Sequence, residues 1–99
     1  MHEPAHPLAC ENVLLTVVGQ DRVGIIARVA TVLAENDINI LDVNQKIVQG
    51  YFVMTLMADV AQSKIDMETL SRTMDDLGRE LGLKIICQHE SIFRSMHRI

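Results

Sequence analysis

The sequence of 99 residues predicts an α+β protein with a ferredoxin-like fold, in which two helices cover one face of a four-stranded antiparallel sheet. Its apolar residues change between strand-like and helix-like spacing in the order β-α-β-β-α-β. The link between the second and third strands is a single Gln-Gly turn, which requires an antiparallel hairpin. Right-handed crossovers then put both helices on the same face of the sheet. We expect one domain over residues 12–92, an arm at 1–11 and a tail at 93–99 with the apolar spacing of a short helix.

The domain begins with a strand and a helix. Residues 13–18 are apolar with one exception, which predicts a buried central strand that ends at Gly19. Between residue 23 and about residue 36, polar residues recur at helical spacing, and an Asn-Asp pair after them is expected to end the helix. This pattern predicts a helix on the sheet with a buried stripe of Ile26, Val29, Ala30 and Leu33.

A β-hairpin follows the first helix. Residues 38–48 predict the second strand, but its apolar residues alternate in different phases on either side of Leu41, so we expect a bulge or bend there. The turn at 49–50 leads into the third strand at 51–60, which is apolar in both phases. Because two helices cover only one face of the sheet, a second copy or the chain's own arm and tail must shield the other face.

The second helix begins after residues 63–66, where Ser and Asp are available as caps. Pairs of opposite charge four residues apart support its outer face. A left-handed cap is expected at Gly82, and residues 83–92 form the predicted fourth strand. The core-facing residues of the helix are Met67, Leu70, Met74, Leu77 and Leu81.

Composition and charge argue against several functions. A net charge of -4 and a pI near 5.4 provide no basic surface for nucleic acid or anionic lipid, so neither partner is expected. Cys10 and Cys87 form no CxxC motif and suggest reduced thiols. No apolar run approaches the roughly 18 residues of a membrane span, and the N-terminus is unlike a signal peptide, so we expect a cytoplasmic protein. His2, His6 and Cys10 match no zinc spacing, and neither a metal nor another cofactor is predicted.

The junction between the first strand and the first helix is the candidate binding site. A Gly-Gln-Asp-Arg-Val-Gly loop runs straight into the helix, so the free N–H groups of the first turn suit an anionic small molecule. The junction supplies no nucleophile, and we do not expect an enzyme. Asp21 suits either the N-cap or the ammonium group of a ligand whose carboxylate is held near Gly24 and Ile25. Arg22 suits a solvated position or an anion clamp.

Polar residues of the second strand complete the predicted site. In this interpretation Asn39, Asp42 and Asn44 lie at the same end of the sheet as the loop, where they either face water or contact the ligand. The neighbouring isoleucines suit the aliphatic stem of a ligand, and a partner subunit is expected to contribute groups. The predicted ligand-binding residues are Asp21, Arg22, Val23, Gly24, Ile25, Ile26, Asn39, Ile40 and Asp42.

The loop and the helix after it resemble the first half of an ACT domain. That family's loop commonly reads Asp-Arg-Pro-Gly followed by aliphatic residues, and this chain reads VVGQDRVGIIARVATVLAENDINILDVNQ. Asp21, Arg22 and Gly24 match the loop, as do the two isoleucines that follow and the Asn-Ile pair that opens the second strand. Val23 replaces the frequent proline, which removes a rigid first helical position. The resemblance covers about residues 13–92, and more narrowly the chain is similar to small stand-alone ACT proteins of a formerly uncharacterised family, which are also similar to the glycine-cleavage-system regulator.

The resemblance implies a regulatory protein. ACT domains typically bind amino acids at interfaces between two domains and control an attached enzyme or repressor. We expect no enzyme to be attached to this chain, and we therefore expect it to signal through its own oligomer or to a separate enzyme or transcription regulator. ACT domains can also pair through their second strands, which implies a homodimer with one continuous sheet.

Two other functions stay open. Acylphosphatases share this order of elements and use a loop arginine to hold a phosphoryl group and an asparagine to position water, roles that Arg22 and either Asn39 or Asn44 would take. The loop lacks that family's Val-Gln-Gly run. The second alternative is a dimeric adaptor that binds no ligand. RNA binding is less favoured, because it needs aromatic residues on the strands and only Tyr51 and Phe52 are available.

Overall fold

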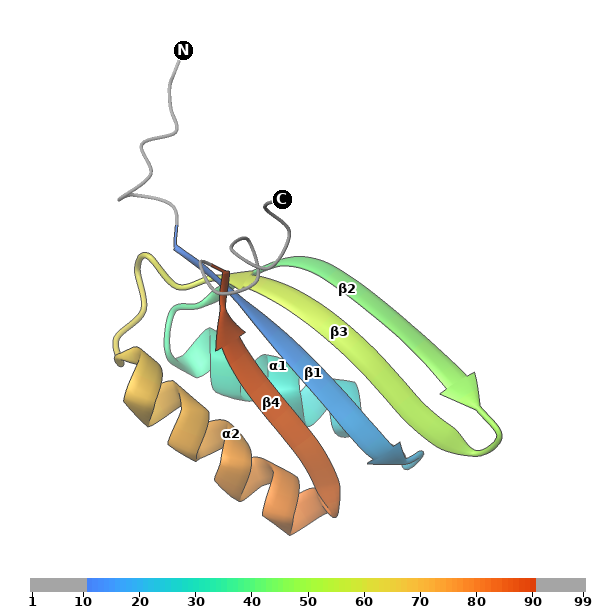
Figure 1. Ribbon diagram of the computed structural model, residues 1–99. Coiled ribbons are helices and arrows are strands. Elements are labelled where there is room, and N and C mark those ends of the chain that lie inside the picture. Colours follow the sequence, from blue (N-terminus) through green and yellow to red (C-terminus); the bar gives the residue numbers. More distant parts are fainter. Residues whose placement is uncertain (1–10, 91–99) are drawn as a thin grey trace, which may run out of the picture.

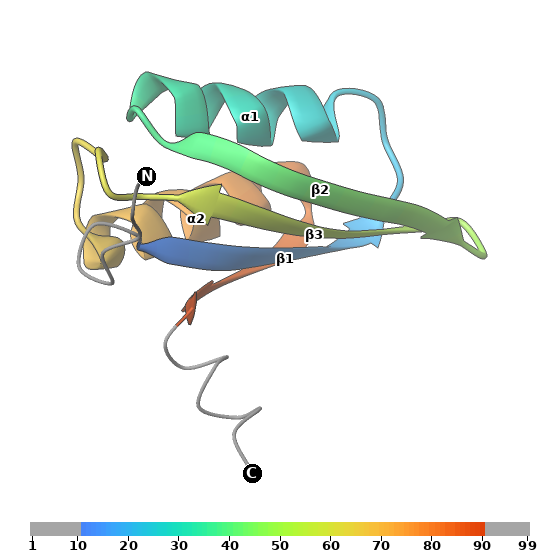
Figure 2. The ribbon, with the colours of Figure 1, turned by 90° about the horizontal axis from the view of Figure 1, so that it is seen from above.

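The predicted order of elements is confirmed. The computed structural model describes residues 11–90, and the strands lie in the order β2-β3-β1-β4, with every neighbouring pair antiparallel. Both helices pack on one face of this sheet (Figures 1 and 2). The elements are β1 Asn12–Gln20, α1 Ile25–Glu35, β2 Asn39–Val48, β3 Tyr51–Asp59, α2 Met67–Leu81 and β4 Leu83–His89.

The core lies between the sheet and the helices. Side chains alternate across a strand, so every second residue of the central strands β1 and β3 faces the helices and is buried. The sequence predicted that β1 is buried on both faces, but its other face is partly exposed: Leu14 and Thr16 are half-buried and Val18 is 39% exposed, because neither α1 nor α2 lies on that side. The buried strand residues facing the helices are Val13, Leu15, Val17, Phe52, Met54, Leu56, Ala58, Leu83 and Ile85.

The first strand and the first helix differ from the prediction at their junction. β1 does not end at Gly19 but continues to Gln20, because both residues still pair with β3. The stripe of α1 also begins one residue earlier than predicted, and Ile26 is 40% exposed rather than buried. The buried residues of α1 are Ile25, Val29 and Leu33, which recur every four residues and so share one face of the helix.

The hairpin of β2 and β3 agrees with the sequence prediction. The register shifts between Ile40 and Asp42, which confirms a bulge at Leu41. The turn residues Gln49 and Gly50 have φ angles of 51° and 84°. Two positive values are typical of a type I′ turn, whose twist matches that of the strands. β2 forms one edge of the sheet.

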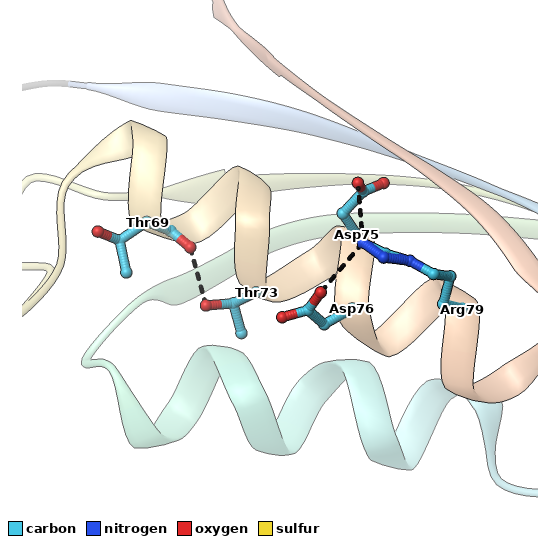
Figure 3. Close-up of polar contacts among 5 residues, drawn as sticks. All are labelled: Thr69, Thr73, Asp75, Asp76 and Arg79. Atoms are coloured by element: carbon cyan, nitrogen blue, oxygen red, sulfur yellow. Dashed lines mark hydrogen bonds and ion pairs between the residues drawn. The ribbon is translucent and has the colours of Figure 1, made fainter.

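The second helix has a well-defined start and a charged outer face. At the start, Asp66 is the N-cap and accepts a hydrogen bond from the backbone N–H of Thr69 at 2.9 Å. On the outer face, Arg79 lies 3.5 Å from Asp75 and 3.1 Å from Asp76 (Figure 3). The predicted left-handed cap at the other end is confirmed by the φ of 71° at Gly82.

The fourth strand is shorter than predicted. It ends at His89, and Glu90 already has helical backbone conformation. The strand stops there because β1 pairs with it only as far as Val13. The predicted tail at 93–99 and all but one residue of the predicted arm lie outside the described residues. In the described range, no helix is long and apolar enough to cross a membrane.

Candidate functional site

A pocket opens between the first turn of α1 and the ends of β2 and β3. Its volume is about 370 Å³, within the usual range of small-molecule sites. It contains every predicted loop residue except Val23, which is fully exposed to solvent. The lining residues are Asp21, Arg22, Gly24, Ile25, Ile26, Ala27, Gln45, Ile47 and Phe52.

The start of α1 is open to an anion. Gly24 is the N-cap, with φ of 92° and ψ of 3°, a left-handed conformation that strains most other residues. No side chain of the described residues caps the helix, and its first turn carries no acidic group. The prediction of Asp21 as N-cap is wrong, because the helix starts four residues later and the backbone N–H of Asp21 donates to the carbonyl of Gly50 at 3.2 Å. The positive end of the helix dipole therefore faces the pocket with no acidic side chain in the first turn, while Asp21 lines the same pocket before the helix starts.

Arg22 is anchored between two helix ends. Its Nη1 donates to the carbonyl oxygen of Leu81 in the last turn of α2, at 3.4 Å. A cation is favourable at this negative end of a helix dipole. The arginine also lines the pocket, and a guanidinium has five N–H donors in all. Arg22 therefore combines a structural contact with a position from which it can reach an anion.

The other walls of the pocket come from residues that the sequence analysis missed or assigned elsewhere. Phe52 is buried, Ile47 of β2 is 56% exposed, and both line the pocket together with Ile26 of α1. Gln45 adds one amide group. The predicted hairpin is the feature of the sequence that could have identified these residues. A hairpin places the end of β2 beside the start of β3, and the start of β3 pairs with the end of β1, from which the loop follows.

The predicted residues of the first half of β2 are not part of this pocket. Asn39 pairs with Asp59 at the end of the sheet where β1 begins, whereas the loop follows Gln20 at the opposite end. Ile40 and Asp42 lie close to Asn39 along the same strand. We expected these residues to lie at the same end of the sheet as the loop, and within a single chain this is wrong. The loop and α1 return the chain to the end of the sheet where β1 begins, and β2 starts there.

The acylphosphatase arrangement is likewise not assembled. Asn39 is at the far end of the sheet from Arg22. Asn44 pairs with Thr55, whose neighbours in β3 are buried on the helix side, so Asn44 faces the side of the sheet away from α1. Neither asparagine therefore lies beside the loop arginine.

Other chemistries find little support among residues 11–90. Burial raises the pKa of the Cys87 thiol, although a hydrogen bond with Ser71 opposes the shift, so the thiol is protonated at neutral pH. No group of three or more His, Cys, Asp or Glu side chains in this range could hold a metal. Phe52 is buried against the helices, which leaves Tyr51 as the exposed member of the aromatic pair considered for RNA stacking.

Comparisons with known proteins agree with the fold and the loop. A family model described as ACT domain matches residues 11–88. A UPF0237 protein of Methanocaldococcus jannaschii is 47% identical over 88 residues, which cover 89% of this chain and 98% of that protein. An ACT domain protein from Streptococcus pneumoniae has a TM-score of 0.76 and 33% identity, over 85% of this chain and 94% of the other.

One further structure shows similarity of fold alone. It is assigned as a glycine cleavage system transcriptional repressor and has a TM-score of 0.69 with 20% identity, over 80% of this chain and 45% of the other. The family match, by contrast, spans most of the chain and includes the whole loop around Gly24. The chain therefore belongs to the ACT domain family, whose members are regulatory domains that typically bind small molecules.

Proposed function

We propose that this protein is a cytoplasmic sensor of an amino acid or a similar small carboxylate, and that it controls a separate enzyme or transcription regulator. The observation that carries the proposal is the uncapped start of α1, which opens into a pocket with an apolar wall. The ligand carboxylate accepts hydrogen bonds from the first-turn N–H groups. Asp21 attracts its ammonium group, and Ile26 and Ile47 contact its aliphatic stem.

A homodimer completes the proposed site. All of β2 except Ile40 is exposed at the sheet edge, including the apolar side chains of Leu41, Val43 and Ile47, which are 50%, 41% and 56% exposed. A long apolar edge strand is a template for pairing with another chain. Antiparallel pairing of two β2 strands about a two-fold axis places the first half of one strand beside the second half of the other.

This pairing explains how residues at opposite ends of one sheet serve a single ligand. The second half of β2 contributes Gln45 and Ile47 to the pocket. In the paired sheet, the first half of the partner's β2 lies beside that pocket, and Ile40, which pairs with the buried Ala58, is the predicted residue of that half that faces the helix side. Two equivalent sites result, and ligand binding is coupled to the subunit interface.

A thermal-shift screen against amino acids and small carboxylates tests the proposal. A ligand at about 100 times its Kd adds roughly 2.7 kcal/mol of stability, which raises the Tm by a readily measured amount. If no compound of these classes raises the Tm, the ligand-free adaptor is the better description of the protein.

The charge at the helix start is tested with two variants of Gly24. Asn and Asp both tolerate left-handed backbone better than other non-glycine residues, and a Cβ at Gly24 meets no described atom within 4 Å. Gly24→Asp is expected to abolish binding, because its carboxylate repels that of the ligand, whereas Gly24→Asn, the control of matched size, retains binding within a few-fold. Equal Kd values by calorimetry, with both variants folded, would place the ligand elsewhere.

A further inference from the structure

Among the described residues that line the pocket beside α1, Gln45 is the one with an uncharged polar side chain. Four residues of β2 face the helices, because each pairs with a buried residue of β3, and they are Ile40, Val43, Gln45 and Ile47. Gln45 itself pairs with Met54, which is fully buried. The other three are apolar, so a single amide interrupts the apolar side of this strand where it lines the pocket.

The strand pairing gives the position of this amide along the pocket. Ile47 pairs with Phe52, which pairs with Gly19 close to the loop, whereas Gln45 is two residues farther from the loop on the same face of β2. Two strand residues span about 6.6 Å. Both charged side chains that line the pocket belong to the loop. The pocket therefore has a charged end at the loop, an apolar part at Ile47 and an amide beyond it.

This order of groups matches an amino acid with a polar group at the end of its side chain. The carboxylate and the ammonium group occupy the loop end, as in the proposed function. The aliphatic part of the side chain then passes Ile47, which is 56% exposed and available for contact. Three or four single bonds of about 1.5 Å each carry the end of the side chain most of the way to Gln45.

A neutral amide is the side-chain end that Gln45 recognises most fully. The Gln45 amide has an NH₂ donor and a carbonyl acceptor, so a second amide placed head to tail forms two hydrogen bonds with it. An aliphatic end removes water from the Gln45 amide without replacing its hydrogen bonds, which disfavours binding. A carboxylate end has no partner of opposite charge there, because the one cation among the described lining residues, Arg22, belongs to the loop.

We propose that Gln45 determines the specificity of the pocket and selects an amino acid whose side chain ends in a neutral amide. This inference rests on the proposed function, because it assigns a side-chain class to the ligand of that same site. In the free protein Gln45 is exposed and its amide is hydrated. Selection therefore arises only when a ligand displaces that water.

Calorimetry with glutamine, methionine and glutamate tests the selection. The three side chains have similar length and end in an amide, a thioether and a carboxylate. We expect the wild-type protein to bind glutamine roughly tenfold more tightly than either of the others, the effect of about one hydrogen-bonded group. Gln45→Met should bring the affinities for glutamine and methionine close together. Asn44→Leu is the control, because it removes an amide from the adjacent residue on the opposite face of the sheet, and it should keep the wild-type preference.

The outcomes separate this inference from the proposed function. Melting curves first establish that both variants are folded. Wild-type protein that binds methionine as tightly as glutamine, or a preference for glutamine that persists in Gln45→Met, would overturn the role of Gln45 and leave the sensor intact. If none of the three binds but another small carboxylate raises the Tm, the amide class is wrong and the sensor again stands. If no amino acid or small carboxylate raises the Tm, both proposals fail.

Discussion

At the scale of single residues, Gly78 controls how closely α2 approaches the sheet. The residue is buried in the last turn of α2, and glycine is less favourable than alanine within a helix. A Cβ at this position would lie 2.7 Å from the carbonyl oxygen of Leu83 and 3.4 Å from Cγ1 of Ile85. The backbone oxygen cannot move aside as a flexible side chain can, so the glycine permits the close packing of α2 on β4.

We therefore predict that Gly78→Ala destabilises the protein by about 1–3 kcal/mol, the usual cost of overfilling a packed site. The sign is informative, because the same change at an exposed helical position stabilises by about 1 kcal/mol. Urea unfolding of Gly78→Ala and Gly78→Val measures the effect, and the larger side chain is expected to cost more. A stabilised Gly78→Ala variant would show that α2 does not pack this closely.

At the scale of elements, α2 depends on the charge of its N-cap. The hydrogen bond from the backbone of Thr69 lowers the pKa of the Asp66 carboxyl. The folded protein therefore binds this proton less tightly than the unfolded chain. The ionised cap stabilises the fold above the unfolded pKa of about 3.9, and this contribution is lost as the pH falls through the lower folded-state pKa.

Asp66→Asn tests this linkage, because asparagine also caps helices but does not titrate. We expect the variant to have a lower Tm than the wild type at pH 7, where the wild-type cap is ionised and favoured by the helix dipole. The difference should shrink below about pH 4, as the aspartate becomes protonated. Melting curves of both proteins between neutral and acidic pH measure it, and a difference that stays constant would argue against the ionised cap.

At the scale of the whole molecule, the exposed edge of β2 is the surface through which we propose that two chains pair. Val43 is 41% exposed on the helix side of this strand and lies away from the pocket lining. Lysine on an edge strand opposes pairing with another chain. We predict that Val43→Lys converts the proposed dimer into a monomer of 11.1 kDa and weakens ligand binding, since two subunits form each proposed site.

Sedimentation velocity at micromolar concentration measures the change in mass. Ala34→Lys, an apolar-to-lysine change on the exposed side of α1, serves as the control and should leave the dimer intact. If the wild-type protein is a monomer under the same conditions, pairing through β2 is wrong. If Val43→Lys remains a dimer, the chains associate through another surface.

The sequence by itself determined the features that depend on near neighbours along the chain. The order of elements follows from hydrophobic periodicity, because one face of each helix or strand must be buried. The bulge at Leu41 was visible as a change of phase, and the caps at Asp66 and Gly82 follow from their local hydrogen bonding and backbone conformation. The loop around Gly24 could be proposed as a binding site from the sequence, because the helix start immediately follows it.

Only the tertiary structure decided which distant residues meet. Gln45, Ile47 and Phe52 join the loop because two antiparallel pairings bring the end of β2 beside the end of β1. The same topology sends Asn39 to the opposite end of the sheet, since α1 first returns the chain along its full length. Ile26 faces this pocket instead of the core because the left-handed Gly24 sets where the helix begins. Periodicity records which side of an element is apolar, but pairing between strands sets what that side touches.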